Sequence, residues 1–153
     1  MTGLMARVHL LAVPVAMLTL AACVPRHNRL EPYSKDEALA RAIEARAARA
    51  CSETHPARVP PNPFTTDGCS VWPDSTWVDC CVDHDFRYWC GGTCEQRRQA
   101  DRELRKCVEQ YAPVWAKLMY VGVRLGAVPW TPFPWRWGYG WDGIHCYADP
   151  DAE

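Results

Sequence analysis

Apolar residues recur at helical spacing between residues 95 and 111, and a strongly basic set of side chains fills the opposite face. The apolar positions are Ala100, Leu104, Cys107, Val108 and Tyr111, and the basic positions are Arg97, Arg98, Arg102, Arg105 and Lys106. This periodicity is typical of an amphipathic helix that packs on a core with one side only. Thr93 and Gln96 match a capping box, so we expect the helix to begin just after Thr93.

Asp101 interrupts this pattern, because it lies at the edge of the apolar stripe, three residues before Leu104 and seven before Val108. A carboxylate in such a position is costly to bury unless a partner compensates its charge. We therefore expect Asp101 to be paired with a polar group on a neighbouring element.

A second helix is predicted over residues 77–89, where the pattern is compatible with a helix until CGGTC breaks it at residues 90–94. The short connection should place this helix antiparallel to the one after Thr93, as a hairpin. A third helix is predicted from a capping box at Ser34 along the alanine-rich run to Ala50. Its apolar content is thin, mostly Leu39 and Ile43, which suggests packing at the edge of the domain.

The C-terminal extension, residues 112–153, is rich in tryptophan and proline and is predicted to be irregular, because WTPFPWRWGYGW has too many prolines for a helix. Its rings could dock on lipid at a membrane interface, or they could complete a small core, because the whole chain has only three phenylalanines. The second interpretation is favoured. Residues 114–128 are too interrupted by Lys117 and Arg124 to span a bilayer.

The N-terminal segment has the layout of an export signal: Arg7, an apolar run from Val8, and small residues up to Cys23. The apolar run is short for a membrane span. The sequence Leu-Ala-Ala-Cys at residues 20–23 is similar to a bacterial lipobox, in which the cysteine is acylated and begins the mature protein. We expect residues 1–22 to be a signal peptide, Cys23 to be lipidated and residues 23–33 to be a tether. An ordinary cleaved signal that ends near a cysteine is the alternative.

Export changes the interpretation of the cysteines, of which the chain has nine, or eight without Cys23. An even number in a small exported protein predicts a disulfide framework. A zinc ion shared by Cys90 and Cys94, together with His84, is the alternative, although C-x3-C without a second pair is a weak zinc pattern. The formal net charge of −1 gives no indication of nucleic-acid binding.

Candidate chemistry is concentrated on the predicted helix at residues 77–89. Its side chains gather on two adjacent stripes, with Cys80, His84 and Tyr88 on one and Cys81 and Asp85 on the other. On an antiparallel neighbour, Asp101 can lie opposite His84 and Tyr88. A carboxylate bonded to one imidazole nitrogen leaves the other nitrogen free as a base, while Asp85 stays available to a cation. Because no strong serine-nucleophile motif is present, this arrangement favours ester hydrolysis by water.

The pattern C-C-x-x-H-D-x-x-Y, formed by Cys80, Cys81, His84, Asp85 and Tyr88, resembles the active-site helix of secreted phospholipases A2. The resemblance covers roughly residues 64–111, which we take as the core, preceded by a helix and proline-rich linker at residues 34–63. It implies that His84 activates water, that Asp85 binds calcium, and that Asp101 orients His84 with support from Tyr88.

The resemblance also implies a calcium loop at DGCSVWPD, residues 67–74, which is similar to the short loop of bacterial and fungal members of the family. Asp67 and the carbonyl oxygen of Gly68 would then join Asp85 as calcium ligands. The glycine-rich loop of the animal enzymes is absent.

Two disulfides are implied by the same resemblance. The pairing common in the family would join Cys69 to Cys81, and the pairing of the animal enzymes would join Cys80 to Cys107. The resemblance leaves four cysteines without an assigned partner: Cys51, Cys90, Cys94 and Cys146.

The expected protein is therefore mainly α, stapled by disulfides, phospholipase A2-like and lipid-anchored in the bacterial cell envelope, with Val24 after the cysteine favouring the outer membrane. The expected activity is calcium-dependent hydrolysis of the sn-2 acyl ester of glycerophospholipids at a membrane or micelle surface. The alternative is a non-catalytic envelope or binding module on the same scaffold.

Overall fold

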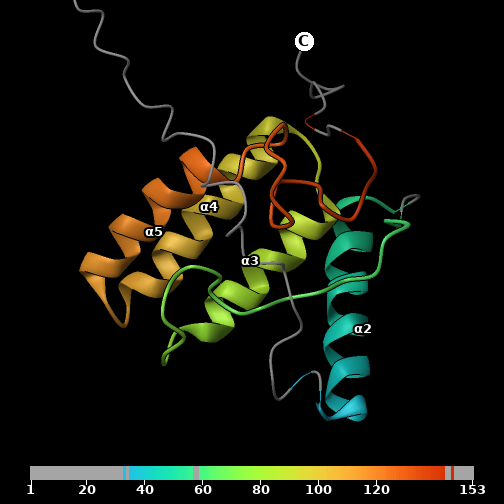
Figure 1. The fold of residues 1–153 in the computed structure, drawn as a ribbon, viewed down its shortest axis with the longest axis horizontal. Helices are drawn as coiled ribbons and strands as arrows, with labels where there is room; N and C mark the ends of the chain where they lie inside the picture. The colour runs from blue at the N-terminus through green and yellow to red at the C-terminus, as the bar shows by residue number, and fades with distance from the viewer. Residues whose placement is uncertain (1–32, 34, 57–58, 144–145, 147–153) are drawn as a thin grey trace, which may run out of the picture.

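The computed structural model describes residues 33, 35–56, 59–143 and 146, which contain four α-helices and no β-strand. The helices are α2 (Glu37–Thr54), α3 (Val78–Cys90), α4 (Cys94–Glu109) and α5 (Pro113–Gly126). Figure 1 shows α3 and α4 in the middle, with α2 packed against α3 and α5 packed against α4. The prediction of a mainly α, disulfide-stapled fold is confirmed. The predicted signal peptide and Cys23, the predicted lipidation site, lie outside the described residues.

Helix α2 differs at both ends from the prediction. Asp36 caps it, because its carboxylate accepts hydrogen bonds from the backbone N–H groups of Ala38 and Leu39 at 2.9 and 3.0 Å. Asp36 is therefore the cap of α2 in place of the predicted Ser34, which lies outside the described residues. The helix also continues past Ala50, and its buried face is a stripe of small and apolar residues: Ala40, Ile43, Ala47 and Cys51. Small side chains on this stripe let α2 lie close to α3.

Helices α3 and α4 form the predicted antiparallel hairpin. The start of α3 is joined to the end of α4 by the Cys80–Cys107 disulfide. The turn needs glycine at Gly91, which has a φ of 70° and whose added Cβ would lie 3.0 Å from the Cα of Gly138. The capping box at Thr93 is confirmed, since its hydroxyl accepts from the Gln96 N–H while the Gln96 side chain accepts from the Thr93 N–H.

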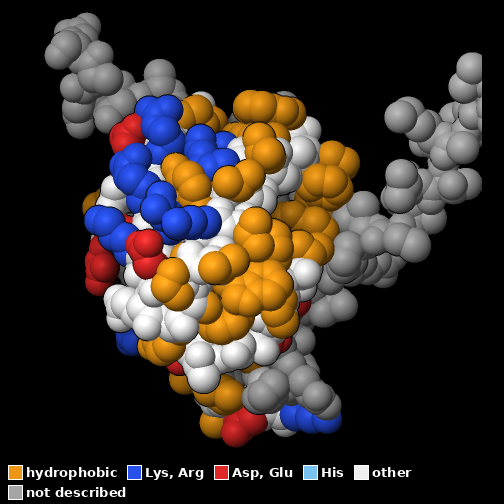
Figure 2. Space-filling model, turned by 90° about the vertical axis from the view of Figure 1, so that its left-hand side faces the viewer, with side chains coloured by type: hydrophobic (Ala, Val, Ile, Leu, Met, Phe, Trp, Pro, Cys, Tyr) orange, Lys and Arg blue, Asp and Glu red, His pale blue; other side chains and the backbone are white. Residues whose placement is uncertain are grey.

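The C-terminal extension is not irregular throughout, because its first part forms α5, a helix that the sequence analysis did not predict. Proline at the first position of a helix is tolerated, since that N–H has no partner within the helix. The inner face of α5 buries Ala116 and Met119, and Gly122 makes room for Trp72, to which an added Cβ would come within 2.7 Å. The outer face carries exposed hydrophobic side chains (Figure 2).

After α5 the chain is irregular, as predicted, and it folds back over the C-terminal end of α3 (Figure 1). The N–H groups of Gly138 and Gly140 donate to the carbonyls of Tyr88 and Trp89 at 2.7 and 3.2 Å, and the Trp141 indole donates to the Cys90 carbonyl at 2.7 Å. These bonds satisfy carbonyl groups that the end of a helix leaves without partners. Residues 138–141 therefore pack against the end of α3 and supply hydrogen bonds to its last carbonyl groups.

The tail aromatics do not all have one role. Trp137 is buried and packs edge-on against Tyr88, with ring centroids 5.0 Å apart, so the interpretation that the tail completes the core holds for this residue. Trp130 is 68% exposed and contributes little to the core.

Four disulfides join Cys51 to Cys90, Cys69 to Cys81, Cys80 to Cys107 and Cys94 to Cys146. The second and third are the two pairs that the resemblance implied. Because Cys90 and Cys94 belong to different disulfides, the zinc alternative is wrong. In the part of the chain described here, no helix has the length and apolar content needed to cross a membrane.

Candidate active site

His84, Tyr88 and Asp101 meet in the interior where α3 faces α4. His84 and Tyr88 lie one turn apart on α3, and the antiparallel arrangement brings Asp101 of α4 opposite both of them. His84 Nε2 lies 3.0 Å from Asp101 Oδ1, and the Tyr88 hydroxyl donates to the same oxygen at 2.7 Å. Asp101 is fully buried, and both aromatic rings of the group are buried with it. The structure therefore brings together the three residues that the sequence singled out for catalysis.

Asp101 is held ionised by its neighbours. Burial raises its pKa, but the hydrogen bond and charge of His84, followed by hydrogen bonds from Arg124 and Tyr88, lower the pKa below its usual value. An ionised carboxylate only accepts hydrogen bonds, so His84 Nε2 must carry the proton that it shares with Asp101. In the neutral imidazole this leaves Nδ1 unprotonated and able to act as a base.

Tyr88 is a permanent donor in this group. Burial, and then the negative charge of Asp101, raise the pKa of its hydroxyl well above the usual value, so the hydroxyl keeps its proton at neutral pH. On its other side, the Tyr88 oxygen accepts a hydrogen bond from Arg97 Nε at 3.3 Å. Tyr88 thus ties the position of Asp101 to that of Arg97.

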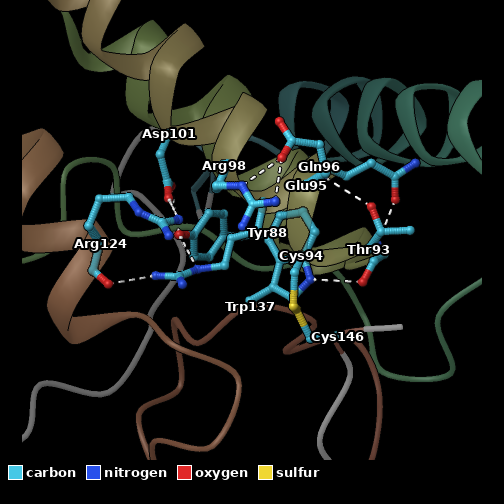
Figure 3. Close-up of a disulfide and its surroundings, with 12 residues drawn as sticks. Tyr88, Thr93, Cys94, Glu95, Gln96, Arg98, Asp101, Arg124, Trp137 and Cys146 are labelled. Atoms are coloured by element: carbon cyan, nitrogen blue, oxygen red, sulfur yellow. Dashed lines mark hydrogen bonds and ion pairs between the residues drawn. A yellow bond between two sulfur atoms is a disulfide. The ribbon is translucent and has the colours of Figure 1, made fainter. Parts of the chain in front are cut away.

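Two arginines complete the group, and the sequence analysis missed both (Figure 3 shows one, Arg124, beside Asp101 and Tyr88). Arg124 of α5 donates from its guanidinium to Asp101 Oδ2 at 2.6 Å. Arg97 of α4 donates to the carbonyl oxygens of Val123 and Arg124 at 2.8 and 3.0 Å, where a cation also compensates the negative end of α5. Through these bonds α5 is part of the site.

The prediction that Arg97 belongs to the exposed basic face of α4 is wrong, because Arg97 is buried. The spacing contained a signal for this position: Arg97 precedes Asp101 by four residues and Leu104 by seven, which places all three on one stripe. Arg124 has no such local signal, since its bond to Asp101 spans 23 positions and depends on α5 being a helix.

Asp85 points away from this group and toward the segment before the predicted calcium loop. Its Oδ2 accepts a hydrogen bond from the Thr66 hydroxyl at 2.6 Å, and the Thr66 oxygen accepts from the Gly68 N–H at 3.1 Å. Asp85 and Thr66 are both buried. Thr66, which the sequence analysis did not name, therefore joins the α3 carboxylate to the loop.

The charges of Asp67 and Asp85 both affect the Tyr139 hydroxyl. Its hydroxyl donates to the Thr65 carbonyl at 2.6 Å, and its pKa is raised well above the usual value by burial first, and then by the negative charges of Asp85 and Asp67. Both carboxylates are therefore close enough to the Tyr139 hydroxyl for their charges to act on it. Asp67 also accepts a hydrogen bond from the Ser70 hydroxyl at 2.9 Å.

Gly68 holds the loop in a conformation that other residues would not adopt easily. Its φ is 79°, and an added Cβ would lie 2.5 Å from a carboxylate oxygen of Asp74. Asp74 in turn accepts from the N–H of Cys69 at 2.9 Å, and Cys69 is joined to Cys81 on α3. The loop is thus pinned to α3 on both sides of Gly68.

A pocket of about 180 Å³ opens beside these groups. His84, Asp85, Tyr88 and Gly68 line its polar part. Its apolar walls come from the loop, α4, α5 and the tail: Trp72, Leu104, Met119, Val123, Phe133 and Trp135. His84 also borders a larger hollow of about 460 Å³ on the α2 side, whose rim mixes arginines with acidic residues. The imidazole therefore stands between an apolar space and a charged one.

The donors near Asp85 fit a hard cation. Two carboxylates, Asp67 and Asp85, both act on the Tyr139 hydroxyl, and oxygen donors suit calcium or magnesium better than zinc. Within residues 33–143, apart from the positions left undescribed, no three His, Cys, Asp or Glu side chains are grouped as a ready-made metal site. A backbone carbonyl, water or substrate would have to supply the remaining ligands, because calcium takes roughly six to eight oxygens.

Comparisons of the chain with known protein families, with curated proteins and with solved structures find no match.

Proposed function

We propose that this protein is a calcium-dependent hydrolase of the phospholipase A2 type, which cleaves the sn-2 acyl ester of glycerophospholipids at a membrane or micelle surface. The observation that carries the proposal is the buried His84–Asp101 pair at the polar part of an apolar pocket that Asp85 also lines. The resemblance of the C-C-x-x-H-D-x-x-Y pattern to secreted phospholipases A2 supports the same assignment.

His84 would be the general base. Nδ1 would take a proton from a water molecule as the water oxygen attacks the ester carbonyl carbon, and the imidazolium would return that proton to the leaving alkoxide. Asp101 would hold the ring in place and stabilise its positive charge during the reaction. Tyr88 would keep the carboxylate of Asp101 in position through its hydrogen bond of 2.7 Å.

The loop and α3 would hold the metal ion. Asp85, Asp67 and the carbonyl oxygen of Gly68 would be its protein ligands, with the orientation of Asp85 set by Thr66. When bound, calcium supplies positive charge that stabilises the oxyanion of the reacting ester. The apolar walls of the pocket would receive an acyl chain next to these groups.

The test is release of fatty acid from mixed phospholipid micelles by the full chain, with calcium and with a chelator. His84→Gln should lower the rate by about 100-fold or more, because a general base contributes roughly that factor or above. His55→Gln is the matched control, since His55 lies at the end of α2, does not line the pocket, and has its ring nitrogen 3.4 Å from the Gly91 carbonyl. No release by disulfide-bonded protein across several head groups, or equal rates for the two variants, would contradict the proposal.

A non-catalytic binding module on the same scaffold is the second candidate, and Arg124 is the observation that favours it. A guanidinium 2.6 Å from Asp101 partly neutralises the charge that should stabilise a protonated His84. Calcium titration separates the two candidates. Under this alternative, binding should be too weak to measure at millimolar calcium, and Asp85→Asn should change nothing. Under the hydrolase proposal, the parent binds calcium and Asp85→Asn abolishes binding.

A further inference from the structure

The outer face of α5 is an exposed apolar stripe. Val114, Leu118, Val121 and Leu125 follow one another at intervals of four, three and four residues, and they are 71%, 49%, 53% and 75% exposed. Such spacing places all four on one side of the helix. Single exposed hydrophobic residues are ordinary on protein surfaces, but a continuous apolar row indicates a surface that something else covers.

The other faces of the same helix form the candidate active site. Met119, Gly122, Val123 and Gly126 line the apolar pocket, and Arg124 bonds to Asp101. The stripe and the pocket are thus two sides of a single helix. Val71, which is also exposed, lines the pocket from the loop, so apolar surface reaches the pocket rim.

Basic side chains border the stripe. Helix α5 contains Lys117 and no acidic residue, and the exposed face of α4 beside it carries Arg105 and Lys106. The Arg105 guanidinium lies 5.8 Å from the ring centre of Tyr120, which places the two helices' outer faces next to each other. Figure 2 shows the result: hydrophobic side chains cover much of this face, and Lys and Arg are grouped along one edge of them.

We propose that the α5 stripe docks on an anionic phospholipid surface. An apolar row flanked by Lys and Arg is the pattern of a helix that lies in the plane of a bilayer, with its apolar side among the acyl chains and its cations at the head groups. A second copy of this chain would bring the same cations against each other, which disfavours self-association through this face. The proposed function gives the docking its purpose, because lipid would enter the pocket from this side, but docking itself requires no turnover.

The test compares two tryptophan reporters in the full chain. Leu118→Trp places the reporter in the stripe, and Leu39→Trp places a matched reporter on a similarly exposed leucine of α2. Each is mixed with vesicles of phosphatidylglycerol and phosphatidylcholine brominated on the acyl chains, in the presence of a chelator. Any N-terminal anchor holds both variants at the membrane equally, so the difference reports only which face meets the bilayer.

We expect the Leu118→Trp reporter to lose at least twice the fraction of its added fluorescence that the Leu39→Trp reporter loses. High salt, pure phosphatidylcholine, or a further Leu125→Glu change should reduce that loss. Equal quenching of the two reporters, or none in either, overturns the proposal. Sedimentation gives a second contrary outcome: if lipid-free parent is a dimer and Leu125→Glu is a monomer, the stripe is an interface between copies.

Hydrolysis of a monomeric short-chain phospholipid separates this proposal from the proposed function. Leu125 does not line the pocket, so Leu125→Glu should keep this activity and lose activity on vesicles. Quenching at the stripe without any hydrolysis by the parent would leave docking in place and contradict the hydrolase. Hydrolysis with equal quenching of the reporters would contradict docking alone.

Discussion

Each outer helix is joined to the central hairpin by one arginine–aspartate pair, and the two pairs differ in their surroundings. On the α2 side, Arg46 and Asp83 of α3 lie 2.9 Å apart, with side chains that are 49% and 59% exposed. On the α5 side, Arg124 and Asp101 of α4 lie 2.6 Å apart, and Asp101 is fully buried. The same chemistry is therefore screened by solvent in one place and built into a polar network in the other.

The pKa shifts of the two carboxylates go in opposite directions. The pKa of Asp83 is raised, by partial burial first, because the opposing charge of Arg46 does not offset that burial and the Asp79 carboxylate adds to it. The pKa of Asp101 is lowered despite greater burial, because hydrogen bonds from His84, Arg124 and Tyr88 favour its charge. The direction of each shift therefore depends on the hydrogen bonds around the ion pair. Of these two pairs, the α5 pair is the one with further hydrogen bonds to its aspartate, from His84 and Tyr88.

The largest effect should come from removing the shared carboxylate. Asp101→Ala leaves His84, Tyr88 and Arg124 without their common partner in the interior, so we expect the free energy of unfolding to fall by about 3–5 kcal/mol. Urea denaturation measures this loss. Asp79→Ala, in the first turn of α3, is the control and should change little. A loss below about 1 kcal/mol for Asp101→Ala would mean that the network does not hold α5 to the hairpin.

A smaller effect, with a pH dependence, should follow from Arg124→Met. The folded-state pKa of Asp101 lies below its ordinary value of 3.8, so its stabilising contribution is present above that value and is lost as the pH falls through the folded-state pKa. Without Arg124 that pKa moves up toward the unfolded value. Stability at pH 7 should fall by about 1–3 kcal/mol.

The dependence of stability on pH in acid gives a sharper test of the role of Arg124. As the pH falls below 3.8, the ordinary value for Asp101, the stability of Arg124→Met should change less with pH than that of the parent, because less of it depends on ionised Asp101. Denaturation curves at several pH values compare the two slopes. A variant with an unchanged slope would show that Arg124 does not act through Asp101.

The smallest effect should come from the α2 pair. Arg46→Ala removes an exposed ion pair and a guanidinium 5.3 Å from the ring centre of Phe86, so we expect a loss of about 1 kcal/mol or less, reduced further by salt. Thermal unfolding at low and high salt measures it. If Arg46→Ala costs as much as Arg124→Met, the contrast between the two sides of the hairpin is wrong.

The hairpin was predictable because its signals are local. Periodicity and the Thr93 capping box lie within single segments, and the contacts of His84 and Tyr88 with Asp101 follow from antiparallel packing of two neighbouring helices. Asp101 was recognisable as a polar interruption of an apolar stripe. These parts of the molecule need no information from distant residues.

The missed parts depend on distant residues. Helix α5 was overlooked because the prolines that follow it dominate the composition of the extension. Arg124 was treated only as a charge that interrupts an apolar run, since its partner lies on another helix. Thr66 has no distinguishing pattern in the sequence, and its role appears only in the fold, where its hydroxyl donates to Asp85. In each case the physical role comes from a neighbour that the folded chain supplies and the local pattern does not show.

The return of residues 138–141 over the end of α3 has a consequence for the order of folding. The bonds from Gly138 to Tyr88 and from Trp141 to Cys90, together with the Cys94–Cys146 disulfide, join positions about fifty residues apart. Contacts of such long range form late, because a large loop must close first. A chain that emerges from its N-terminus would leave the last carbonyl groups of α3 without these partners until residues 138–141 follow. The support that this segment gives to the end of α3 would therefore form after the local contacts of the hairpin.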